Sequence, residues 1–182
     1  MRSISLLIIF SVSTLSSFII QDCLPPLNGL QPTHILLTPI LFTYGALSLP
    51  FSAMLVLAAF TGFFTDLSTF QVVSGTIEIG IGWSILAYSV LGALVQHVRD
   101  KTLLRGVWWL HPFLSAVCTF SLLSFHYIAI ALHRDGIIFN TTVVWKVCLP
   151  AMIAFLLSPV IGVPFAVLET TLFPRKQTGQ KP

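Results

Sequence analysis

Two carboxylates at the borders of apolar runs hold most of the chemistry that the sequence offers. Asp66 follows the uncharged run 23–65, and Glu78 precedes the uncharged run 79–98. A carboxylate in such a place is either an interfacial charge that caps a helix or a functional group on an ion or proton path. We expect Glu78 in the first turn of a helix, where its charge meets the positive end of the helix dipole.

Small residues precede Asp66 at helical spacing. Gly62 lies one helical turn before it and Ala58 one turn earlier. Small residues on one helix face let another backbone approach closely, so we expect Asp66 to be held at a helix–helix contact. Stripes of this kind also occur where helices only pack. A second stripe lies near the C-terminus, in a segment that two prolines are expected to kink. The candidate packing or partner-contact residues are Ala58, Gly62, Asp66, Glu78, Ser158, Gly162 and Ala166.

The remaining chemical groups predict neither an enzyme nor a cofactor site. His126 and His133 are seven residues apart and can share a helix face. A metal or haem site is one interpretation of this pair, and interfacial or hydrogen-bonded histidines are the simpler one. No nucleophile elbow, phosphate-binding loop or nucleophile–base pair is recognisable. The cysteines form no CxxC pair and are expected to pack as buried thiols: Cys23, Cys118 and Cys148.

The low proportion of charged residues indicates which kind of helices must position these side chains. Of 182 residues, 8% are charged and 55% are hydrophobic, whereas about a quarter of a soluble domain is charged. A soluble globule and a disordered chain are therefore both excluded. The net charge of +3 includes no basic block that could follow a nucleic-acid backbone. An integral membrane protein remains.

The uncharged runs count the expected helices. One crossing of the hydrocarbon core takes about 20 residues. The longest run must fold back on itself, and Pro50 is the natural break. We predict an all-α fold with six transmembrane helices in one compact bundle over residues 1–173, followed by a cytoplasmic tail, 174–182. Five helices, one of them half-inserted, is the competing count. The predicted helices are 3–21, 33–49, 51–68, 78–97, 107–131 and 145–170.

The basic residues predict the orientation. With both termini inside, Arg134 and Lys146 lie outside, and seven basic residues lie inside: Arg2, Arg99, Lys101, Arg105, Arg175, Lys176 and Lys181. Both termini are therefore expected in the cytoplasm. The first helix has 19 uncharged residues after Arg2, which is longer than the apolar region of a typical signal peptide, so we expect it to be retained.

Several short motifs occur in a recognisable order over about residues 15–100. They are 32–37 (PTHILL), 44–50 (YGALSLP), 62–67 (GFFTDL) and 87–88 (AY). The first resembles the opening of the second helix in the bacterial rod-shape-determining MreD family, and the third resembles that family's G-h-h-x-D-h motif, where h is hydrophobic. The chain departs from the family pattern because the hairpin near Pro50 lacks a positive charge.

The resemblance implies a non-catalytic multipass subunit of the cell-wall elongation machinery, located in the bacterial inner membrane. Such a subunit would bind a bitopic MreC-like protein and, through it, an MreB-like filament and peptidoglycan synthases. The family's fold is similar to that of the substrate-binding subunits of energy-coupling-factor transporters, so binding of a vitamin or another small molecule is the alternative. That function needs convergent polar groups in an outward-facing pocket, and the sequence offers few.

Overall fold

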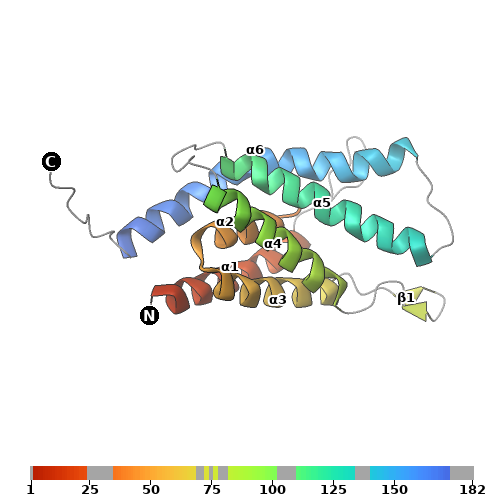
Figure 1. Cartoon of the computed structure of the whole chain (residues 1–182). Coiled ribbons are helices and arrows are strands. Elements are labelled where there is room, and N and C mark those ends of the chain that lie inside the picture. The colour runs from red at the N-terminus through yellow and green to blue at the C-terminus, as the bar shows by residue number, and fades with distance from the viewer. Residues whose placement is uncertain are drawn as a thin grey trace, which may run out of the picture.

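The computed structural model describes residues 2–23, 35–68, 72–73, 76–77, 82–101, 110–133 and 140–172. Within these residues, helices account for nearly all regular structure, and the expected all-α fold is confirmed (Figure 1). A short antiparallel pair of strands joins the third and fourth helices. The elements are α1 (Arg2–Cys23), α2 (Thr38–Ser48), α3 (Phe51–Ser68), β1 (Val72–Val73), β2 (Thr76–Ile77), α4 (Trp83–Lys101), α5 (Leu110–His133) and α6 (Thr141–Leu172).

Four of the six described helices are long and apolar enough to cross a membrane: α1, α3, α5 and α6. The other two fall short for different reasons. α2 has 11 residues and is about 17 Å long, whereas the hydrocarbon core is about 30 Å thick. α4 has 19 residues but carries polar and charged side chains in its last turns, including Gln96, Arg99 and Asp100.

α2 is the central helix of the fold. It contacts each of the other five described helices, and eight of its residues are buried. The sequence predicted a helix over 33–49, but residues 35–37 are not helical and α2 begins at Thr38. Pro39 lies in the first turn, where its missing N–H group costs no helical hydrogen bond. The predicted start was therefore too early.

The predicted start of the fourth helix, at residue 78, also differs from the structure. α4 begins at Trp83, directly after Gly82. Gly82 has a φ of +113°, a positive value that a right-handed helix does not contain, so α4 cannot continue through this residue toward the N-terminus. Glu78 lies outside the described residues, and Ile77 before it belongs to β2. By contrast, α3 occupies the predicted range, because Pro50 sets its start.

α6 is the longest helix, with 32 residues and three internal prolines: Pro150, Pro159 and Pro164. Figure 1 shows it bending away from a straight path in its C-terminal part. Two of the prolines, Pro159 and Pro164, lie in the C-terminal half, and a proline inside a helix removes a helical hydrogen bond. α1 begins and α6 ends at the same end of the molecule, on the left in Figure 1, and β1 lies at the opposite end.

Candidate functional site

Gly62 lies where the backbones of α3 and α4 come closest. A Cβ atom added to Gly62 would lie 2.5 Å from both the Cα and the N atom of Ile85, and 2.8 Å from the carbonyl carbon of Ser84. Ala58, one turn earlier, is also fully buried. Gly62 therefore faces α4 inside the protein, and only a residue without a side chain fits at position 62.

Asp66 completes the contact by capping α4. Its carboxylate accepts hydrogen bonds from the backbone N–H of Gly82, at 2.6 Å from Oδ2, and of Ser84, at 3.1 Å from Oδ1. The first N–H groups of a helix have no partner within the helix, and the dipole favours negative charge there. Asp66 is only 3% exposed, so its charge is stabilised by α4 itself. We call Gly62, Asp66, Gly82 and Ser84 the α3–α4 clasp.

Ser84 and His126 extend the clasp to α5. Ser84 Oγ lies 2.8 Å from His126 Nε2, and the Trp83 and Phe125 rings beside them have centroids 5.5 Å apart. This hydrogen bond between a hydroxyl and an imidazole was not recognisable in the sequence. Ser84 and His126 are 42 residues apart in sequence, and a serine in an apolar run gives no spacing signal. One end of α4 is thus fixed to both α3 and α5.

The Ser84–His126 contact has the distance of a nucleophile and its base, but its surroundings favour a structural role. Ser84 is 0% exposed, so a substrate could not approach its hydroxyl in this conformation. The N–H groups of Gly82 and Ser84 already bind Asp66. These two donors are therefore not free to stabilise an oxyanion.

The second small-residue stripe also faces the interior over part of its length. Ser158 Oγ lies 2.7 Å from His111 Nδ1 and donates to Ser115 Oγ at 3.1 Å. A Cβ atom on Gly162 would lie 3.2 Å from two atoms of the His111 ring. Ser158 and Gly162 thus join α6 to α5, whereas Ala166 is exposed.

Gln21 of α1 caps the N-terminus of α2. Its Oε1 accepts from the backbone N–H groups of Leu37 and Thr38, at 3.0 and 3.4 Å, and its Nε2 lies 2.8 Å from Thr38 Oγ1. Ser17 Oγ is 3.1 Å from the same hydroxyl. The start of α2 is therefore fixed by a side chain from another helix, which the sequence did not reveal.

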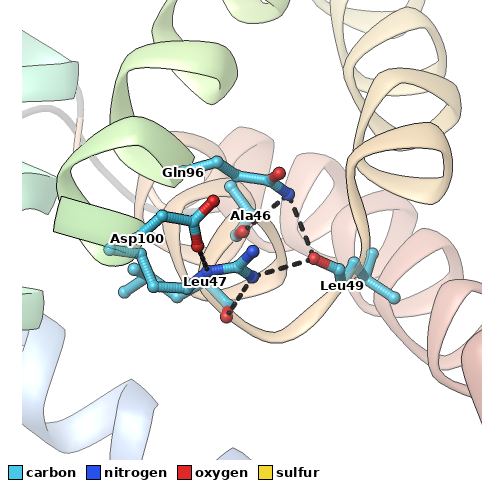
Figure 2. A network of polar contacts seen from close by, with 6 residues as sticks. Ala46, Leu47, Leu49, Gln96 and Asp100 are labelled. Atoms are coloured by element: carbon cyan, nitrogen blue, oxygen red, sulfur yellow. Dashed lines mark hydrogen bonds and ion pairs between the residues drawn. The ribbon is translucent and has the colours of Figure 1, made fainter. Parts of the chain in front are cut away.

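The other end of α2 is capped from α4, as Figure 2 shows. Gln96 Nε2 donates to the carbonyl oxygens of Ala46 and Leu49, at 3.2 and 3.0 Å. Gln96 is buried, and these bonds satisfy its two N–H donors as well as two carbonyls at the end of α2. This cap keeps the hairpin between α2 and α3 attached to α4.

Arg99 brings a positive charge to the same hairpin. Its guanidinium donates to the carbonyl oxygens of Leu47 and Leu49, each at 3.1 Å, and its Nε lies 3.1 Å from Asp100 Oδ1. A cation is favourable at a helix C-terminus. The hairpin carbonyls are thus bound by a charged side chain that follows about 50 residues later in the sequence.

The three cysteines differ in how far they are buried. Cys118 is buried as expected and Cys148 is half-buried, but Cys23 is exposed, so the expectation of three buried thiols was wrong for that residue. Cys23 is the last residue of α1, where the helix leaves the packed region. Among the described residues, no group of three or more histidine, cysteine or acidic side chains could hold a metal ion.

A groove of about 550 Å³ lies between α5 and α6. Its walls carry apolar side chains and one thiol: Phe113, Ala116, Val117, Phe120, Cys148, Ala151, Met152, Phe155 and Leu156. It therefore lacks the convergent polar groups that would orient a polar small molecule.

Comparison with protein-family models, with curated proteins and with solved structures finds no match for this chain.

Proposed function

We propose that this protein is a non-catalytic multipass subunit of the cell-wall elongation machinery, which determines cell shape, in the bacterial inner membrane. It binds a bitopic MreC-like protein and, through it, an MreB-like filament and peptidoglycan synthases. The α3–α4 clasp is the observation that carries this proposal. Gly62 and Asp66, the two fixed residues of the MreD-like motif, act at one contact: Gly62 admits the backbone of α4, and Asp66 caps it. Their one-turn spacing thus has a physical reason.

The proposal includes six membrane crossings in one compact bundle. α2 can be short because the other five helices surround it, and polar side chains from α1 and α4 satisfy its ends. The polar groups at the end of α4 in turn bind α2 rather than lipid. An even number of crossings agrees with α1 beginning and α6 ending at the same end of the molecule (Figure 1). The seven-to-two excess of basic residues supports cytoplasmic termini.

The roles of the polar side chains inside the protein support binding rather than catalysis. Gln21, Asp66, Gln96 and Arg99 each make hydrogen bonds to backbone groups at helix ends. These contacts build a rigid scaffold whose exposed faces are apolar. Such a scaffold suits association with another membrane helix, where many small packing contacts add up.

Reporter fusions test the topology. Fusions after residues 28, 103, 138 and 182 should report outside, inside, outside and inside. A fusion after residue 182 that reports outside, or fusions after 28 and 103 on the same side, would contradict six crossings with cytoplasmic termini.

Depletion in the bacterium that encodes the protein tests the role. The proposal expects rod-shaped cells to become round as the protein is lost, and plasmid-encoded wild-type protein to restore the rods. Uptake of labelled vitamins is measured in the same cells. Unchanged shape combined with lost uptake of one vitamin would refute the morphogenetic role and favour a transporter subunit.

A further inference from the structure

We draw no further inference here: the strongest candidate, the apolar groove between α5 and α6, is an unpartnered face, and nothing in the described part of the chain shows what covers it.

Discussion

Replacing Gly62 by alanine tests the clasp at its tightest point. The added Cβ would lie 2.5 Å from backbone atoms of Ile85, whereas non-bonded carbon atoms approach to about 3.5 Å. The first turn of α4 must therefore move by about 1 Å. Such a shift along the line of the Asp66 bonds would lengthen the contacts to Gly82 and Ser84 from 2.6 and 3.1 Å to about 3.6 and 4.1 Å, beyond hydrogen-bond reach.

The expected cost follows from these changes. Overpacking costs about 1–3 kcal/mol, and a buried N–H group without a partner costs about 1–3 kcal/mol. Alanine regains about 1 kcal/mol of helix propensity. The Gly62→Ala variant should therefore lose about 3 kcal/mol of unfolding free energy if one N–H group loses its acceptor, and about 5 kcal/mol if both do.

Gly92→Ala is the matched control. It makes the same change in a helix, but the atoms nearest to its added Cβ, Met54 Sδ and Phe42 Cζ, belong to side chains, which can turn aside more easily than the backbone of α4. Unfolding in mixed micelles, followed by circular dichroism, gives both free energies, and hydrogen exchange reports on the amides of Gly82 and Ser84. A Gly62→Ala variant as stable as Gly92→Ala, with unchanged exchange at those amides, would refute the reasoning.

Three further predictions concern the other polar contacts of the helix ends. Asp66→Asn should lower the unfolding free energy by about 1–3 kcal/mol, because its amide NH₂ cannot accept a hydrogen bond and one N–H of α4 loses its partner. The double variant with Gly62→Ala should lose less stability than the sum of the two single variants. Additive losses would show that the two residues act independently. Arg99→Gln should lower the unfolding free energy by about 1 kcal/mol and make hydrogen exchange faster at the end of α2. Unchanged exchange would mean that Gln96 alone caps that end. Ser158→Ala should lower the unfolding free energy by about 1–3 kcal/mol, because a buried histidine loses its partner. Ser158→Thr keeps a hydroxyl and should retain more stability. Equal melting temperatures of the two variants would contradict the role of the hydroxyl.

Local signals in the sequence were sufficient for α3 and for half of the clasp. Pro50 and the charge at Asp66 bound one helix, and the predicted range 51–68 is the range observed. Gly62 and Asp66 could be singled out because a small residue and an acid one turn apart are visible in the sequence itself. Their role as partner contacts stays a prediction, since both side-chain positions face α4 in the structure.

The boundaries of α2 and α4 could not be predicted because distant side chains determine them. Gln21 fixes the start of α2 from 16 or 17 residues away, and Arg99 holds its other end from about 50 residues away. Asp66 sets the start of α4 across the connection that contains the β-strands. Counting uncharged residues measures how long a helix can be, but not where its backbone finds external partners.

Native mass spectrometry of the protein extracted in mild detergent tests the central claim most directly. The account predicts the 20.0 kDa chain in a stoichiometric complex with one single-span membrane protein that carries a coiled coil, identified by its fragment sequence. Added vitamins should not change the measured mass. A chain that carries no protein partner and instead retains a small vitamin-like molecule at one-to-one stoichiometry would contradict the account and establish a substrate-binding subunit.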